Sequence, residues 1–283
     1  MYEPKWDGFR VSIARGEGGT VLWSRQGKDL TRFFPDLVAA AEEHIPEGFT
    51  LDGEAVCWAG GRLDFENLQR RLITSASALP RLTREHPASY AAFDVLAVAG
   101  QDARALPFRD RRTLLENLAV GWVPPLNLSP VTRDYQQAVE WFTGLTGAGI
   151  EGLVVKGDGQ LYEGGKRQWL KVKHRDTLDV VCGAVLGSVA HPAALVVGLP
   201  LSGKLGIVGA TSQLPAATAR ALGKVLRPAG PGHPWPSEIP RGYLERFSEN
   251  REPVRLTLVE PFVVEVSADV AWSGWAFRHP VRF

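Results

Sequence analysis

The segment from Lys5 to Ser24 constrains the fold most, because it joins a cluster of charged residues directly to a strand–turn–strand pattern. Apolar and polar residues alternate from Gly8 to Arg15, which predicts a half-buried strand. A Gly-Gly pair then favours a tight turn into a second strand over Thr20–Ser24. Lys5 is therefore expected just before a hairpin, at a rigid edge of a sheet.

The charged residues around this hairpin suit a nucleophilic amine beside a phosphate. Lys5, Asp7, Gly8 and Arg10 fall within one short run. A lysine becomes nucleophilic when neighbouring cations, a metal or desolvation favour its neutral form, and an arginine can bind a ribose or phosphate oxygen. A charged strand edge followed by a turn is the alternative. Arg25 lies in the polar loop after the hairpin, where a plain turn is an equally good interpretation.

A carboxylate pair marks the next predicted strand, Phe49–Trp58. Asp52 and Glu54 lie between apolar residues and are separated by a glycine. Carboxylates in such a strand are costly unless they are paired or bind a ligand. Metal coordination or a ribose hydroxyl would explain Glu54, and an exposed strand face is the alternative.

The predicted strand Tyr90–Val98 carries an aromatic residue with two possible uses. Phe93 is either an ordinary core residue or a stacking platform for a base. Both interpretations stay open on the sequence pattern.

Two further apolar segments bring charges together. The segment Ile150–Lys156 is an apolar strand that contains Glu151 near its start and ends at Lys156. The segment Gln168–Lys173 alternates, so its two lysines are expected on one face with Trp169, Leu170 and Val172 packed around them. Two adjacent lysines repel unless an anion lies between them, so a phosphate or a solvated sheet face would explain Lys171 and Lys173.

The remaining pattern predicts an α+β chain of two domains, 1–178 and 179–283. Helices are expected at Pro35–Ile45, Phe65–Leu72, Pro107–Leu118 and Asp134–Leu145, and a loop is expected to run to Pro87.

From Asp179 onward short apolar strands alternate with Gly/Pro turns. These strands are expected at Val180–Leu186, Ala194–Leu199, Gly206–Gly209, Val254–Val259 and Val263–Val266. A helix at Pro215–Leu226 interrupts the strands, and a loop is expected at Pro228–Pro240. Several short strands with one inserted helix favour a small β-barrel of the OB type.

Charge and cysteine content exclude several classes of protein. The net charge is +1, and residues 1–178 hold 22 Lys and Arg against 23 Asp and Glu, so DNA contact would depend on local patches. Cys57 and Cys182 have no Cys or His partner at metal spacing, which predicts free thiols in a reducing compartment. The sequence has no membrane span or signal peptide, so a cytoplasmic, nucleoid-associated protein without membrane contact is expected.

Taken in order, these motifs resemble those of one superfamily. The motifs are KxDGxR at Lys5, the loop at Arg25, DGE at Glu54, the FD strand at Phe93, EGLVVK at Glu151 and WLKVK at Lys171 and Lys173. The chain resembles the ATP-dependent DNA ligases of the covalent nucleotidyltransferases, and most of all the small bacterial C-type ligases. The resemblance implies an ATP-grasp-like nucleotidyltransferase domain followed by an OB-fold domain.

The resemblance also implies roles for individual residues. Lys5 would be the nucleophile that takes AMP from ATP, and Glu3 would read the adenine amino group. Phe93 would stack on adenine, and Arg10 and Glu54 would hold ribose. Contacts to phosphates would come from Arg25, Lys156, Lys171 and Lys173. Glu54 and Glu151 would place a divalent metal, Mg²⁺ or Mn²⁺.

A three-step ligation follows from this resemblance. Lys5 would form a lysine-AMP phosphoramidate, AMP would pass to the 5′-phosphate at a nick in double-stranded DNA, and the 3′-hydroxyl would then displace AMP. Lys171, Lys173 and the metal would offset the charge that develops on the phosphoryl oxygens, and their positive field would favour neutral Lys5. A monomer with roles in DNA repair, replication or recombination is expected.

Two alternatives stay open. An RNA ligase or a capping-type nucleotidyltransferase shares the same motifs. Only four residues precede Lys5, and the motif that begins at Arg278 stops at Phe283, so weak self-adenylation is expected. A truncated DNA-binding module is the second alternative.

Overall fold

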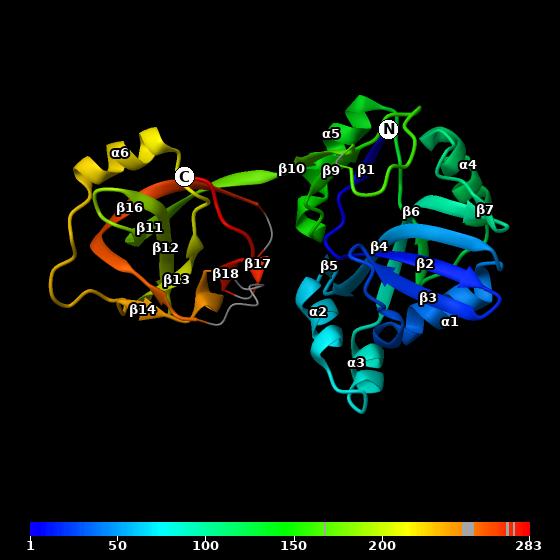
Figure 1. Cartoon of the computed structure of the whole chain (residues 1–283), viewed down its shortest axis with the longest axis horizontal. Coiled ribbons are helices and arrows are strands. Elements are labelled where there is room, and N and C mark those ends of the chain that lie inside the picture. The colour runs from blue at the N-terminus through cyan, green and yellow to red at the C-terminus, as the bar shows by residue number, and fades with distance from the viewer. Residues whose placement is uncertain (167, 245–251, 270–271, 274) are drawn as a thin grey trace. The chain divides into compact units, whose positions relative to one another are not determined.

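The computed structural model describes residues 1–166, 168–244, 252–269, 272–273 and 275–283. It contains two compact units, Met1–His174 and Arg175–Phe283 (Figure 1). The division lies four residues before the expected boundary at Leu178. Residues 175–178 already pair as the start of a long strand within the second unit.

The first unit is built on a large, mainly antiparallel sheet with the order β3-β2-β4-β6-β7. β5 pairs with β4, and β8 pairs in parallel with β6. The strands are β2 (Phe9–Gly16), β3 (Gly19–Ser24), β4 (Phe49–Ala59), β5 (Arg62–Leu63), β6 (Ala88–Val98), β7 (Gln101–Asp102) and β8 (Leu126–Leu128). The predicted hairpin is confirmed as β2 and β3, and it turns its alternate residues Val11 and Ile13 into the core.

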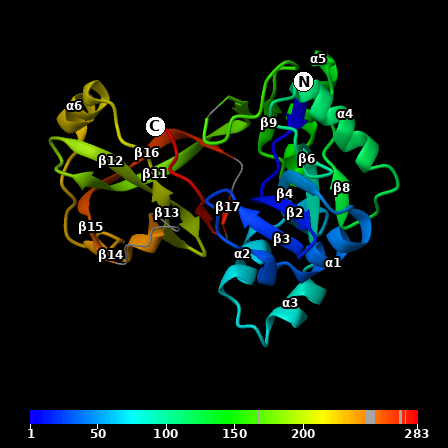
Figure 2. The same ribbon diagram turned by 45° about the vertical axis from the view of Figure 1, so that its right-hand side comes forward.

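Helices pack against this sheet and complete the core (Figure 2). The helices are α1 (Pro35–His44), α2 (Phe65–Ile73), α3 (Leu79–Glu85), α4 (Phe108–Leu118) and α5 (Tyr135–Gly144), with short 3₁₀ turns at η1 (Thr31–Phe33) and η2 (Thr146–Ala148). Leu37 of α1, Leu68 of α2 and Leu115 of α4 pack in one cluster with the sheet. The four predicted helices are therefore confirmed within one or two residues at their ends.

The expected loop before Pro87 is wrong in part, because it contains α3. Pro80 lies in the first turn of α3, where a missing backbone N–H removes no helical hydrogen bond. Leu79 is buried at the start of this helix, so tertiary packing stabilises a segment whose composition favours a loop.

A small antiparallel sheet, β1-β9-β10, carries several site residues. Its strands are β1 (Tyr2–Pro4), β9 (Gly152–Val155) and β10 (Leu170–Lys173). Glu3 and Lys171 both pair with Val154, from opposite sides of β9. The expectation that Leu170 and Val172 pack around the lysines is wrong. They are 67% and 45% exposed, because β10 is the outer strand of this sheet and alternation turns them away from the lysine face.

The second unit is built on the antiparallel sheet β13-β12-β11-β16. Its long elements are β11 (Arg175–Gly187), β12 (Pro192–Leu201), β13 (Lys204–Ala210), α6 (Ala216–Val225) and β16 (Thr257–Asp269). Short elements are β14 (Glu238–Ile239), η3 (Arg241–Tyr243), β15 (Val254–Arg255), β17 (Trp272–Ser273) and β18 (Ala276–Phe277). The prediction of two separate strands at Val254–Val259 and Val263–Val266 is wrong. Most of this range belongs to one continuous strand, β16.

The C-terminal residues complete the curled sheet of the second unit. Val281 donates its N–H to the carbonyl of Ala210 at 3.1 Å, and Arg282 exchanges two backbone hydrogen bonds with Ser267 of β16. The last residues therefore bridge the end of β13 to β16, as closure of a small barrel requires.

The expected loop at Pro228–Pro240 contains β14 and a buried tryptophan. Trp235 is 5% exposed, and its indole N–H donates to the carbonyl of Leu205 at 2.7 Å. Its ring lies over Gly183 and Gly198, where a Cβ atom would approach it to 2.7 and 2.5 Å. The two glycines therefore make room for the tryptophan.

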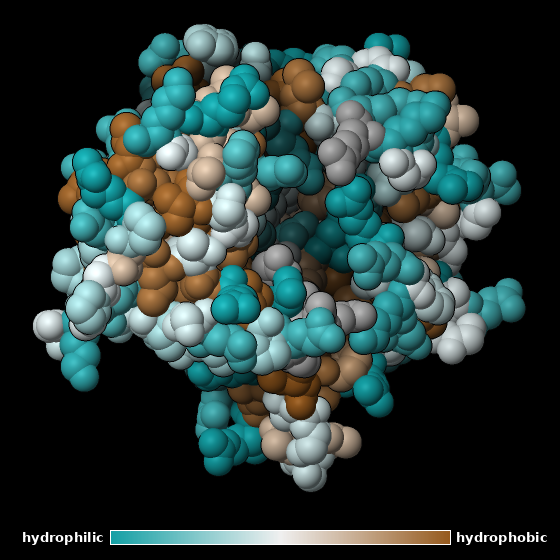
Figure 3. Space-filling model, turned by 60° about the vertical axis from the view of Figure 1, so that its left-hand side comes forward, coloured by the Kyte–Doolittle hydropathy of each residue, from teal (hydrophilic) through white to brown (hydrophobic). Residues whose placement is uncertain are grey.

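Within the described residues, the structure has no helix with the length and apolar character needed to cross a membrane. The face in Figure 3 shows hydrophobic side chains in small groups between hydrophilic ones.

We expect Gly198→Ala to destabilise the second unit by about 1–3 kcal/mol, because the new methyl group overpacks against Trp235. Chemical denaturation followed by circular dichroism measures this loss. Gly230→Ala is the matched control, since nothing lies within 4 Å of its added Cβ. Equal midpoints for the two variants would contradict the packing argument.

Candidate functional site

A cavity of about 500 Å³ in the first unit collects most of the residues selected from the sequence. This volume lies in the range of small-molecule sites. Its walls come from β1, the start of β2, the loop after β3, β4, β6, β9 and the segment that leads into β10. Of the predicted residues, those in the lining are Glu3, Lys5, Arg10, Arg25, Glu54, Phe93, Lys156 and Lys171.

Lys5 lies at the cavity wall, directly after β1. Backbone hydrogen bonds on both sides fix it, with its N–H donating to Gly152 and its carbonyl accepting from Glu151. Its ammonium forms an ion pair with the buried carboxylate of Glu151. The Nζ of Lys173 lies 3.5 Å from the same carboxylate oxygen. The structure thus joins two more predicted residues, Glu151 and Lys173, to Lys5.

Arg10 is held by Asp52, the member of the predicted carboxylate pair to which the sequence pattern assigns no site role. Two guanidinium nitrogens of Arg10 donate to the Asp52 carboxylate, the shorter contact being 2.6 Å. The Tyr162 hydroxyl donates to the same carboxylate at 2.8 Å. Asp52 is 1% exposed, so this pairing offsets the cost of burying its charge. Its place two residues before Glu54, on the same face of β4, was the sequence signal.

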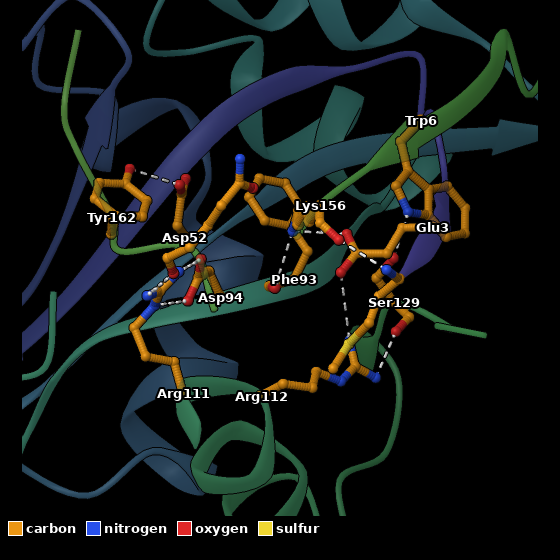
Figure 4. Close-up of polar contacts among 12 residues, drawn as sticks. Glu3, Trp6, Asp52, Phe93, Asp94, Arg111, Arg112, Ser129, Lys156 and Tyr162 are labelled. Carbon is orange, nitrogen blue, oxygen red and sulfur yellow. Dashed lines mark hydrogen bonds and ion pairs between the residues drawn. The ribbon is translucent and has the colours of Figure 1, made fainter. Parts of the chain in front are cut away.

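Aromatic rings and an ion pair form one part of the cavity lining, and Figure 4 shows Phe93 beside Glu3 and Lys156. Phe93 and Trp169 meet edge to face with centroids 5.7 Å apart. The Nζ of Lys156 lies 4.5 and 4.2 Å from their centroids and 2.7 Å from Oε2 of Glu3. Glu3 and Lys156 are both almost fully buried. Trp169 was treated only as a packing residue in the sequence analysis, although WLKVK places it two residues before Lys171.

The position of Lys156 bears on its expected role. The resemblance predicts a contact with the α-phosphate, whereas in this structure Nζ lies 2.7 Å from Oε2 of Glu3 and donates to the carbonyl of Phe93 at 3.3 Å. Arg25 lies in the exposed loop after β3 and belongs to the cavity lining. The individual roles stay predictions.

Burial and neighbouring charges shift the pKa of several groups in the cavity lining, among them Glu54 and Lys171. Burial raises the pKa of Glu54 to about 8, against the opposing positive charges of Lys5 and Arg10. Burial lowers the pKa of Lys171, and the positive charges of Lys5 and Arg25 lower it further. The cavity therefore combines a carboxyl that resists ionisation with a cluster of cations, an arrangement that favours an anionic ligand.

The two predicted metal ligands, Glu54 and Glu151, would suit only a cation that also takes ligands from a bound nucleotide or from water. Across the described ranges, no group of three or more His, Cys, Asp or Glu side chains lies at metal-binding distance. Glu54 and Glu151 both interact with Lys5. Mg²⁺ commonly takes one or two protein carboxylates, with water and substrate phosphates as its other ligands. Two carboxylates beside a phosphate site are sufficient for that mode.

Comparison with known proteins shows which proteins this chain is similar to. Residues 1–173 match the family described as the ATP dependent DNA ligase domain. The chain is 37% identical to DNA ligase C2 of Mycolicibacterium smegmatis and 34% identical to DNA ligase C of Mycobacterium tuberculosis. Each alignment covers 100% of this chain and 84% of the relative.

Solved structures give the same result for the fold. The mycobacterial DNA ligase D complexed with ATP and MES is 27% identical with a TM-score of 0.53, over 100% of this chain and 87% of that one. The ligase domain of M. tuberculosis LigD is 28% identical with a TM-score of 0.52, at the same coverage. The expected nucleotidyltransferase and OB-fold classes are thereby confirmed.

We expect the stability of the chain without nucleotide or metal to fall as pH rises, because the fold favours protonated Glu54. The pKa of this carboxyl rises from 4.5 to about 8, so its contribution is complete below pH 4.5 and is lost as pH rises through 8. Glu54→Gln should remove this loss, on the order of 4 kcal/mol between pH 5 and pH 9. Thermal melts in EDTA measure it, and parallel pH profiles for the two proteins would contradict it.

Proposed function

The chain belongs to the ATP-dependent DNA ligase family, and from that premise we propose that Lys5 is the residue that carries AMP during the sealing of nicks in duplex DNA. The observation that carries this proposal is the position of Lys5. Its amine borders the cavity, pairs with buried Glu151, and lies close enough to Lys171 for their positive charges to interact.

We assign the aromatic end of the cavity to the base of ATP. Phe93 and Trp169 offer ring surfaces there, and Glu3 offers a buried carboxylate that can accept from the adenine amino group. Arg10 and Glu54 border the space between this end and Lys5, which suits the ribose. Arg25 and Lys171 then face the phosphates, joined by Lys173 beside Glu151.

In the first step the ammonium of Lys5 gives up a proton to solvent, and the neutral amine attacks the α-phosphorus of ATP. A nitrogen–phosphorus bond forms, the bond from phosphorus to the pyrophosphate oxygen breaks, and pyrophosphate leaves with the electron pair. The attacking nitrogen loses a second proton to solvent, which leaves the phosphoramidate. Glu151 orients the amine, and Lys171 and Lys173 offset the negative charge on the phosphoryl oxygens. Bound Mg²⁺ or Mn²⁺, held by Glu54 and Glu151, would supply further charge neutralisation.

Two more displacements complete the reaction. The 5′-phosphate at a nick attacks the phosphorus of the lysine-AMP, and the Lys5 nitrogen leaves. The 3′-hydroxyl oxygen then attacks the activated 5′-phosphate and loses its proton to solvent. The phosphodiester bond forms, the bond that joins the 5′-phosphate to AMP breaks, and AMP leaves with the electron pair. Positioning and charge neutralisation are the main demands of such in-line transfers.

We further propose that the chain works as a monomer in the cytoplasm.

Incubation with α-³²P-labelled ATP and Mg²⁺, followed by a denaturing gel, tests the role of Lys5. We expect covalent label on the unmodified chain and a loss of at least about 1,000-fold in Lys5→Ala, because removal of a nucleophile abolishes the covalent step. Lys204→Ala, at the start of β13 in the second unit, is the matched control and should label normally.

The acceptor is tested with the same proteins. Labelled chain mixed with nicked duplex DNA should release its AMP and join the strands, whereas a nicked RNA duplex should give little product. Undiminished label on Lys5→Ala would refute the role of Lys5. Preferential joining of RNA would refute the DNA acceptor while leaving the nucleotidyltransferase step intact.

A further inference from the structure

Arg112 lies behind the carboxylate that we assign to the base of ATP. It comes from α4, and its Nη1 lies 3.9 Å from Oε1 of Glu3. Lys156 contacts the other oxygen, with Nζ 2.7 Å from Oε2. All three side chains are at least 95% buried, and Figure 4 shows Glu3 between the two cations.

Other contacts fix the guanidinium of Arg112. Its Nε donates to Oε1 of Glu116 at 2.7 Å, and its Nη2 donates to the carbonyl of Ser129 at 2.8 Å. The hydroxyl of Ser129 accepts from the indole N–H of Trp6 at 2.9 Å. Among the residues that the structure describes, neither Nη1 of Arg112 nor Oε1 of Glu3 has a hydrogen-bond partner. Arg112 is thus held at a distance too long for a hydrogen bond to Glu3.

At this distance Arg112 acts on Glu3 through its positive charge and not through a hydrogen bond. A positive charge at 3.9 Å in a buried site stabilises the ionised carboxylate, while Oε1 keeps its acceptor capacity. Burial raises the pKa of Glu3, and Lys156 and Arg112 act against that rise. An ionised carboxylate only accepts hydrogen bonds, whereas a protonated one also donates. The 6-amino group of adenine is a donor, and the 6-oxo group of hypoxanthine or guanine is an acceptor.

We propose that Arg112 is a positioning residue for base selection. It holds Glu3 ionised and fixed in orientation, so that the cavity takes a 6-amino purine and rejects a 6-oxo purine. This inference rests on the proposed function, in which Glu3 reads the base of ATP. Arg112 acts through Glu3 and contacts no base itself.

The test compares α-³²P-labelled ATP with α-³²P-labelled ITP, which differs at the 6-position, as donors to Lys5 over a range of concentrations. Arg112→Met should lower the ATP:ITP ratio of kcat/KM by about tenfold or more, because the site loses discrimination between a donor and an acceptor. Most of the loss should lie in the KM for ATP. Arg112→Lys should restore the ratio to within about threefold of the unmodified chain, since it keeps the charge.

Two further variants separate this role from general damage. Arg109→Met removes an exposed arginine from the same helix and should leave the ratio unchanged. Glu3→Gln should lower the ratio by itself, since an amide can also donate. In the double variant Arg112→Met should add no further loss, because its effect passes through Glu3.

Several results would overturn the proposal. One is an Arg112→Met variant that loses activity equally with ATP and ITP, which marks a purely structural role. Another is full additivity with Glu3→Gln. If circular dichroism shows that Arg112→Met does not fold, Arg112→Lys takes its place in the test. The proposal would then be overturned if Arg112→Lys folds but its ATP:ITP ratio of kcat/KM falls as far as that of Glu3→Gln. Failure of the proposed function would give a different result. The unmodified chain would then carry no Lys5-dependent label from either nucleotide, and both proposals would be refuted.

Discussion

Pairing of buried carboxylates with cations is the interaction on which the cavity depends. An unpaired buried charge costs several kcal/mol, so each of these carboxylates fixes the position of a cation. Four such carboxylates in the first unit are at most 2% exposed. The pairs are Glu3 with Lys156, Asp52 with Arg10, Asp94 with Arg111, and Glu151 with Lys5.

These pairs join elements that the backbone sheets alone would not fix against one another. Asp94 of β6 binds Arg111 of α4 through two hydrogen bonds of 2.7 and 2.9 Å, and Arg111 also donates to the carbonyl of Gln160. Asp52 of β4 holds Tyr162 from the same loop. The loop between β9 and β10 is therefore anchored twice, and this anchoring presents Trp169 to Phe93 at the base end of the cavity.

The second unit is stabilised by a different kind of constraint. Its core depends on shape, since Trp235 fills the space that Gly183 and Gly198 leave open. Its sheet is completed by backbone pairing of Val281 and Arg282 with segments far away in the sequence. Arg282, which the resemblance assigns to the last motif of the family, thus has its backbone fixed by the barrel.

The ordered motifs of the sequence identify the family, and most elements could be predicted from it, because alternation and proline position act locally. The hairpin after Lys5 and helix α1 are examples. Tertiary structure alone decided which charges meet. Arg10 and Asp52 are 42 residues apart, Lys5 and Glu151 are 146 apart, and Tyr162 and Asp52 are 110 apart. No local sequence pattern predicts contacts between residues so far apart in the chain. Burial selects the partners, because only the folded chain shows which carboxylates have lost their water.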